Sequence, residues 1–401
     1  MSIRTRRLVL VVLILMMFLT SCWNRREIET LGFVLAVGVD KAAEEGKIML
    51  SVQIAKPFAL AGPSVVAERP FWLVSSTGYT VFEAIRNFLS QSPRRPFWAH
   101  NRFILIGEEL AREGIMEIID LFARDGESRR TVQVVIVKGA KAVDLLQAEF
   151  ELERLPSEGA QGILLGSLAG LGTTVGTELN DLLQMLELPG MEPVALRAEI
   201  VDRPPDVDLR GQSKRDVIST SARLSGAAVF KKDKLVGWLG PKQTRGLLWI
   251  KGEIKGTVLV VEYPNEQDRL ITVEVIRASS KVTPKIIDGK PQIKIEINVE
   301  GNLGETQVFF DPITQLEKWA SIERRVAEAI RGEVQSVLDA AQKEYKSDIF
   351  GFGTSFYRNY YKEWERMQAD WGRLFQELAV EIDIRTGLRR SGLAVRGFLD
   401  I

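Results

Sequence analysis

Hydrophobic and polar positions alternate along the first half of the chain in a way that predicts strands and helices in turn. Strands are expected where apolar residues alternate with polar ones or run unbroken between turn residues, at 33–40, 47–55, 71–75, 101–106, 131–137 and 192–201. Helices are expected after Thr80, whose spacing to Glu83 fits a capping box, from residue 108, and within 140–150 and 161–188. This order predicts a mixed α/β domain over residues 22–191.

The pattern changes after residue 201. Residues 202–216 are poor in apolar residues and rich in proline, which predicts a loop or linker. Strands then follow at short intervals, at 223–230, 235–239, 257–263 and 270–281. Because no helical periodicity separates them, we expect a compact β-rich middle domain over residues 192–285.

The C-terminal third has another order. A strictly alternating strand at 292–300 precedes a long helix at 314–346, a turn at 348–353, an aromatic helix reaching residue 378 and a last strand at 380–385. This β-α-α-β order predicts an α+β domain over residues 286–401. The predicted fold class is therefore α+β (mixed α/β), with three domains of mixed sheets flanked by helices.

The N-terminal residues have the pattern of a bacterial lipoprotein signal. Arg4, Arg6 and Arg7 precede an apolar run at 8–19, which is short for a membrane span of about 20 residues. The run ends in Leu-Thr-Ser-Cys, which predicts a signal peptide at 1–21 and a lipidated Cys22. Two or more acyl chains would anchor the protein stably. An ordinary secretory signal with an incidental cysteine, or an uncleaved helix, is the alternative.

Composition narrows the function classes. The chain has 53 Lys+Arg, 53 Asp+Glu, one histidine and one cysteine. A neutral chain has no basic field for nucleic acid, and a single Cys and a single His leave no intrachain disulfide, Cys-based zinc cluster or multi-His site. We therefore expect no metal, no cofactor and no nucleic-acid partner, although sites built only from carboxylates stay open.

The candidate chemistry is weak. The glycine-rich stretch 159–176 lacks the Gly-Lys-Ser/Thr ending of a phosphate-binding loop. Arginines near His100 and Trp98 form a possible anion site, for which a solvated loop is the favoured interpretation; they are Arg94, Arg95 and Arg102. No Gly-x-Ser-x-Gly elbow is present, and we predict that the protein is not an enzyme.

Aromatic residues near the C-terminus are candidates for a structural or partner surface. A stripe with alternating steps of three and four contains Tyr357, Tyr360, Trp364, Met367, Trp371, Leu374 and Leu378. Covering the C-terminal sheet is the favoured interpretation of this stripe, and docking a partner helix is the alternative. The segment 226–252, with Trp238 and Trp249, is a second candidate surface. We expect the turn Gly351-Phe352-Gly353 to set the angle between the two C-terminal helices.

Four stretches together resemble the Ger(x)C family, the lipoprotein C subunits of bacterial spore germinant receptors. They are CWNRREI leading to GVDK at 22–41, FWAHN at 97–101, GAAVFKKDKLVGWLGPKQTRGLLWIKG at 226–252 and DIFGFGTSFYRNYY at 348–361. Asn24 stands where the family commonly has Asp, and Tyr361 where Pro often follows the aromatic residues. These departures concern local turns.

The resemblance implies a three-domain protein without enzyme activity, anchored on the outer face of the membrane and, in spores, on the inner spore membrane. It implies A-type and B-type membrane subunits as partners and a receptor that responds to small nutrients. Recognition of the nutrient is usually attributed to those other subunits. Two further function classes are weighed: a lipid-anchored solute-binding protein of a transporter, and a cell-envelope hydrolase.

Overall fold

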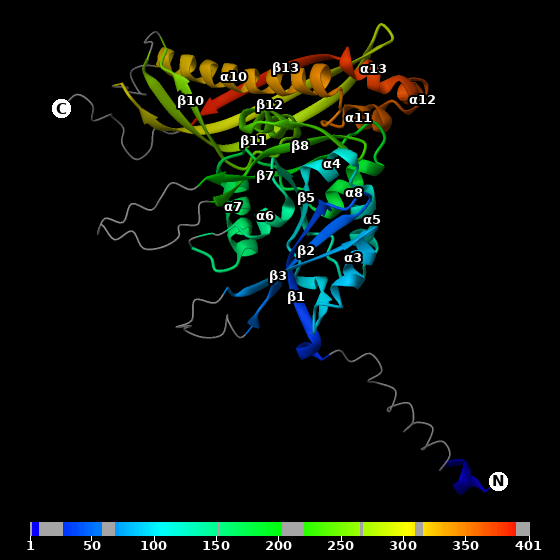
Figure 1. Cartoon of the computed structure of the whole chain (residues 1–401). Helices are drawn as coiled ribbons and strands as arrows, with labels where there is room; N and C mark the ends of the chain where they lie inside the picture. The colour runs from blue at the N-terminus through cyan, green and yellow to red at the C-terminus, as the bar shows by residue number, and fades with distance from the viewer. Residues whose placement is uncertain are drawn as a thin grey trace, which may run out of the picture.

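The computed structural model describes residues 2–7, 27–57, 69–148, 150, 152–202, 220–264, 268–308 and 316–389. Cys22, most of the predicted signal peptide and most of the predicted linker lie outside the described residues. A large and a small sheet, with helices packed on them, make up the described body (Figure 1). The structure confirms the predicted α+β class.

The large sheet has nine strands in the order β3-β2-β1-β5-β6-β7-β8-β9, with β4 paired to the start of β1. Their bounds are β1 (Leu31–Lys41), β2 (Ile48–Ala55), β3 (Phe71–Gly78), β4 (Arg95–Phe97), β5 (Phe103–Gly107), β6 (Gln133–Lys138), β7 (Val194–Asp202), β8 (Thr220–Lys231) and β9 (Lys234–Leu239). Strands β1, β5, β6 and β7 are parallel, whereas β2, β3, β8 and β9 run antiparallel to their neighbours. Fully apolar β5 fits a strand buried on both faces.

Helices cover both faces of the large sheet, as the alternation of side chains along its strands requires. One face packs against α3 (Val81–Phe88), α4 (Glu108–Glu113), α5 (Met116–Arg124) and α8 (Leu179–Glu187). The other face packs against α6 (Ala142–Leu146) and α7 (Pro156–Gly170). The cap predicted at Thr80 is confirmed, because its hydroxyl accepts a hydrogen bond from the Glu83 N–H at 3.1 Å. Short 3-10 turns precede β1 and β5, at η1 (Ile28–Thr30) and η2 (Trp98–His100).

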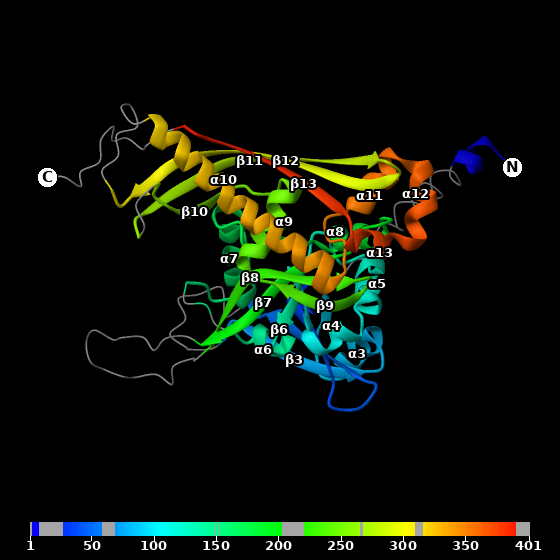
Figure 2. The same ribbon diagram turned by 90° about the horizontal axis from the view of Figure 1, so that it is seen from above.

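The small sheet has the order β10-β11-β12-β13, with bounds Thr257–Glu262, Leu270–Ile287, Lys290–Thr306 and Ala379–Leu388. Strands β11 and β12 form a long hairpin whose turn, Asp288-Gly289, has φ angles of 50° and 73°. Two positive φ angles are what a tight two-residue hairpin turn needs. The long helix α10 (Leu316–Asp339) lies across this sheet and continues as the π-helix η3 (Ala340–Tyr345) (Figure 2).

The helix predicted to run to residue 378 is broken into four pieces, so the prediction of one continuous aromatic helix is wrong. The pieces are α11 (Phe352–Asn359), α12 (Tyr361–Met367), the 3-10 turn η4 (Gln368–Asp370) and α13 (Trp371–Gln376). The first break falls at Tyr360, whose φ and ψ of −137° and 57° are not helical. Folding the segment back on itself brings the ring of Trp371 within 5.6 Å of that of Phe356.

The segment predicted as a β-rich middle domain, 192–285, has no sheet of its own. Its strands β7 to β9 extend the large sheet, β10 and β11 belong to the small one, and the predicted boundary at 285 falls inside β11. The absence of a helix here was also wrongly predicted, because α9 (Pro241–Lys251) lies between the two sheets. The sequence pattern indicates where strands lie but not which distant strands they pair with. It therefore cannot place a domain boundary between them.

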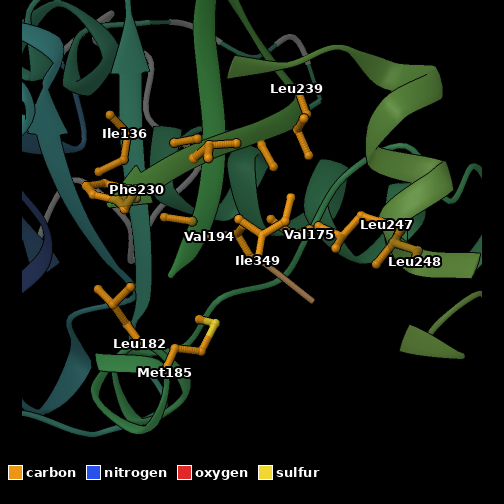
Figure 3. Packing of buried hydrophobic residues seen from close by; sticks show 14 of the residues in the cluster. Ile136, Val175, Leu182, Met185, Val194, Phe230, Leu239, Leu247, Leu248 and Ile349 are labelled. Carbon is orange, nitrogen blue, oxygen red and sulfur yellow. The ribbon is translucent and has the colours of Figure 1, made fainter. Parts of the chain in front are cut away.

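A single hydrophobic core connects the two sheets. It includes side chains from the large sheet, from α8 and α9, and from the small sheet, with Phe230, Leu247 and Leu248 among those in Figure 3. Helix α9 contacts β8 on one side and both α10 and β11 on the other. Among the helices that the structure describes, none has the length and apolar character needed to cross a membrane.

Candidate functional site at the junction of the two sheets

The motif at 348–361 begins in a tight loop where the π-helix η3 ends and continues into α11. Lys346 and Gly351 have φ angles of 51° and 74°, and these left-handed residues turn the chain twice within six positions. The side chain of Ile349 enters the shared core near Val194 (Figure 3). The loop therefore occupies the contact between the C-terminal segment and the large sheet.

Asp348 is the centre of this loop. Its side chain is buried, and its two carboxylate oxygens accept hydrogen bonds from the Phe352 N–H at 3.1 Å, the Gly353 N–H at 2.8 Å and the Trp371 Nε1–H at 3.0 Å. Burial raises the pKa of Asp348 to about 6, although these hydrogen bonds act in the opposite direction. One carboxylate thus holds the start of α11 against α13.

Neighbouring groups bind the same loop to β8 of the large sheet and to the segment between α8 and β7. The Asp348 carbonyl accepts from the Glu192 N–H at 2.9 Å. The Ser347 hydroxyl donates to the Phe230 carbonyl at 2.6 Å, and the Thr354 hydroxyl donates to the Pro189 carbonyl at 2.9 Å. We call residues 347–354 with Trp371 the Asp348 junction, because their contacts join segments more than 100 positions apart.

Two glycines permit the closest approach in the junction. A Cβ on Gly353 would lie 2.6 Å from the Gly190 Cα and 2.7 Å from the Trp371 Nε1. Gly190 itself has a φ of 67°, and a Cβ there would lie 2.5 Å from the ring of Trp364. Backbone atoms cannot give way as a flexible side chain can, so both positions need glycine.

A second buried link joins α9 to α10. Arg245 forms an ion pair with Glu333, with 13% and 10% of the two side chains exposed. The other Glu333 oxygen accepts from the Trp249 Nε1–H at 3.0 Å. A Cβ on Gly246 would lie 2.3 Å from the Glu333 carbonyl oxygen, so this glycine lets the two helices touch. Trp249 is therefore an internal packing residue.

The sequence-predicted residues divide between these two links and the surface. Gly351, Phe352, Gly353, Trp364 and Trp371 come together at the Asp348 junction, where Trp364 and Trp371 are buried. The aromatic stripe thus contributes mainly to the core. Trp238 is half-buried on β9, where its indole N–H donates to Glu108 at 3.4 Å, and Tyr357 is half-buried beside Tyr361. Cys22 lies outside the described residues.

The possible anion site around His100 is not assembled. The His100 ring packs edge-on against Phe33 at 5.3 Å, whereas Arg95 pairs with Glu127 and Arg102 with Glu158, and Trp98 is buried. Within the described ranges, no group of three or more His, Cys, Asp or Glu side chains is arranged to hold a metal ion.

A polar depression of about 690 Å³ opens at the carboxyl end of the parallel strands β1, β5 and β6. Ligands often bind at this edge of open α/β sheets. Its buried acid, Asp40, accepts from the Ala142 and Val143 N–H groups at 2.7 and 3.0 Å, and Glu108 accepts from the Gly139 N–H at 2.9 Å. These carboxylates hold helix starts and loops in place.

Sequence reasoning missed Asp40 and Glu333 as buried polar centres. Asp40 directly follows an apolar strand, which was a usable signal for a side chain at a sheet edge. Glu333 sits on α10 among other charged residues, and nothing local separates it from a solvated glutamate.

Two sequence profiles of known families match the chain. The profile described as "Spore germination protein N-terminal domain" matches residues 24–200. The profile described as "Spore germination B3/ GerAC like, C-terminal" matches residues 225–392. The boundary between the two matched regions falls within the large sheet, where β7 and β8 are neighbours.

Individual proteins are similar over almost the whole length. Spore germination protein KC of Bacillus subtilis (strain 168) is 27% identical, with 97% of each chain covered. Spore germination protein A3 of the same organism is 26% identical, covering 97% of this chain and 98% of the relative. The crystal structure of the GerBC protein has a TM-score of 0.52 at 20% identity, covers 88% of this chain and 96% of that chain, and supports the fold.

Proposed function

The chain belongs to the Ger(x)C family of spore germination proteins, and we propose that it is the lipid-anchored C subunit of a germinant receptor. In this role it would be a non-catalytic partner of A-type and B-type membrane subunits, on the outer face of the cell membrane and, in spores, of the inner spore membrane. The observation that carries the proposal is the match of both germination profiles, which together extend over nearly all of the described body.

The anchor is proposed at Cys22. The apolar run at 8–19 followed by Leu-Thr-Ser-Cys supports it, and the chain has no other cysteine. Cys22→Ala is expected to abolish acyl labelling and either release the protein from membranes or leave it unprocessed, because no other thiol is available. Metabolic labelling with a fatty-acid analogue, followed by membrane fractionation, measures both effects. Normal labelling of the variant would contradict the proposed anchor.

A role in assembly is supported by what the buried polar groups do. The two buried carboxylates with the most side-chain and backbone donors, Asp348 and Glu333, hold helices and sheets together. A rigid body held at the membrane has a high effective concentration towards membrane-embedded partners.

Co-purification tests this role directly. In a deletion strain complemented with the tagged, lipid-anchored protein, we expect the A-type and B-type subunits to co-purify and the germination response to return. His100→Ala is the control for hidden catalysis, since it removes the chain's one histidine and is expected to leave germination unchanged. Turnover of a substrate by the purified protein, or full germination after deletion with no paralogue present, would contradict an assembly role.

A further inference from the structure

We infer that the end of the large sheet at which β1 begins rests on anionic phospholipid headgroups. The inference depends on the proposed membrane anchor and adds which face of the body meets the lipid. We call this face the basic end. It consists of η1, β4, the end of α3 and the side chains that line two depressions beside them.

The sheet topology brings these segments together. Residue Leu31, which directly follows η1, pairs with Arg95 in β4, and a Cβ on Gly32 would lie 3.7 Å from the Arg94 Cβ. Ala55 at the end of β2 pairs with Phe71 at the start of β3, and both lie at the same end of β1. In Figure 1 this end lies at the bottom, away from the small sheet.

The two depressions of the basic end are lined mainly by basic residues, although the chain has 53 basic and 53 acidic residues. Two depressions of about 370 and 400 Å³ flank β4. The ionisable side chains in their linings are Lys56, Arg86, Arg94, Arg95, Arg124 and one acid, Asp125.

Ion pairs compensate part of this charge. Arg95 pairs with Glu127 at 3.0 Å and Arg124 with Asp120 at 2.8 Å. Glu27, directly before η1, and Glu29 within it flank Ile28 at the same end, so the acids named here equal the bases of the two linings in number. Arg86 and Arg94 form no ion pair within the part of the chain that the structure describes, so they are the two cations best placed to meet an anionic surface.

Apolar side chains are exposed among these cations. Ile28, Phe82 and Leu89 are 70%, 53% and 40% exposed. The Arg86 guanidinium lies 5.0 Å from the centre of the Phe82 ring. Exposed apolar groups mixed with arginines are typical of surfaces at the membrane interface, where the apolar part enters the headgroup layer and the charge meets phosphate.

The tether favours lipid over another protein as the occupant. Five residues lie between Cys22 and Ile28, and the six residue steps between them span at most about 20 Å. The body would therefore remain within reach of the headgroups whether or not a partner is bound. Each arginine near an anionic membrane changes the ratio of docked to undocked protein by about fivefold.

The experiment uses the full lipid-anchored chain in vesicles of phosphatidylcholine with or without phosphatidylglycerol. A nitroxide label is attached to a cysteine introduced at one of two positions. Leu89→Cys puts it at the basic end, and Tyr361→Cys puts it on α12, where Tyr361 is 54% exposed. We expect a lipid-soluble relaxation agent to relax the label at 89 only when the vesicles contain phosphatidylglycerol. The label at 361 should stay in water in both kinds of vesicle. Arg86→Gln with Arg94→Gln should lower the docked ratio by about 25-fold, while the control pair Arg358→Gln with Arg366→Gln should leave it unchanged.

Three results would overturn the inference. If the protein floats with the vesicles but the label at 89 stays in water, the anchor holds and the lipid contact is wrong. If the label is shielded only in native membranes that contain the other receptor subunits, the basic end binds protein. If the protein does not float at all, the anchor itself fails, and this inference fails with it.

Discussion

Gly353→Ala is expected to destabilise the protein by about 3 kcal/mol or more, the largest effect of any single methyl group added in the junction. The new Cβ would lie 2.6 Å from the Gly190 Cα and 2.7 Å from the Gly190 carbonyl oxygen. Relief requires moving the loop away from the large sheet. That movement would also strain the hydrogen bond from the Gly353 N–H to Asp348, now 2.8 Å long. Denaturant unfolding of the full chain in a non-ionic detergent measures the loss.

Gly372→Ala is the matched control for this change. Gly372 is an exposed helical glycine of α13, and a Cβ there would have no atom within 4 Å. Alanine is the better helix former, so this variant should keep the wild-type stability or gain up to about 1 kcal/mol. Equal stability of both variants would mean that Gly190 and Gly353 do not touch in solution.

The need for glycine at 353 has a different origin from the one at 351. Gly351 has a positive φ, at 74°, which favours glycine. Gly353 lies in the first turn of α11, and a close backbone contact makes it necessary instead. A local sequence pattern indicates a turn, but a contact with Gly190, 163 positions earlier, is a property of the folded chain only.

Most strands could be predicted because each alternates or is bounded by turn residues, as β2 and β12 do. Helix α9 could not, because it is buried on several sides and its residues 247–250 are consecutive apolar positions. Such a run fits a buried strand equally well. The stripe from Tyr357 to Leu378 has helical spacing throughout, yet the chain breaks at Tyr360, where tertiary contacts of Trp371 with Asp348 outweigh local propensity.

The same difficulty affects the candidate site. Asp348 was predicted as part of a turn, but its three donors are up to 23 positions away, and its loop packs against segments more than 100 positions away. Trp238 and Trp249 are both tryptophans of the motif at 226–252. Trp238 is half-buried on β9, whereas the indole N–H of Trp249 donates to buried Glu333. Sequence alone assigns them equally to a surface.

Asp348→Asn is expected to change how stability depends on pH. The pKa of Asp348 is raised by burial from 3.8 to about 6 in the folded protein, so between those values the folded state binds more protons than the unfolded state. The contribution of this group to stability is therefore full below about pH 4 and declines as the pH rises through 6. A shift of this size corresponds to roughly 3 kcal/mol.

The asparagine variant should be less stable at low pH, because in either orientation its amide nitrogen faces at least one N–H donor and cannot accept from it, whereas both oxygens of a protonated carboxyl retain lone pairs. We expect the stability difference between wild type and variant to narrow by roughly 3 kcal/mol between pH 4 and pH 7. Burial lowers the pKa of nearby Lys251, and the charge of Asp348 opposes part of this lowering. Denaturant unfolding across this pH range gives the difference directly.

Asp339→Asn provides a control of opposite sign. The hydrogen bond from Lys343 lowers the pKa of Asp339, so the contribution of Asp339 is present at neutral pH and lost as the pH falls. The difference in unfolding free energy between wild type and variant should therefore change with pH in opposite directions for Asp348→Asn and Asp339→Asn. If the stability difference between wild type and Asp348→Asn widens towards pH 7, the three N–H donors outweigh burial in their effect on the pKa of Asp348. The junction would then stabilise the carboxylate rather than the neutral acid. The direction of that change with pH decides which of the two effects controls the charge at the contact between the sheets.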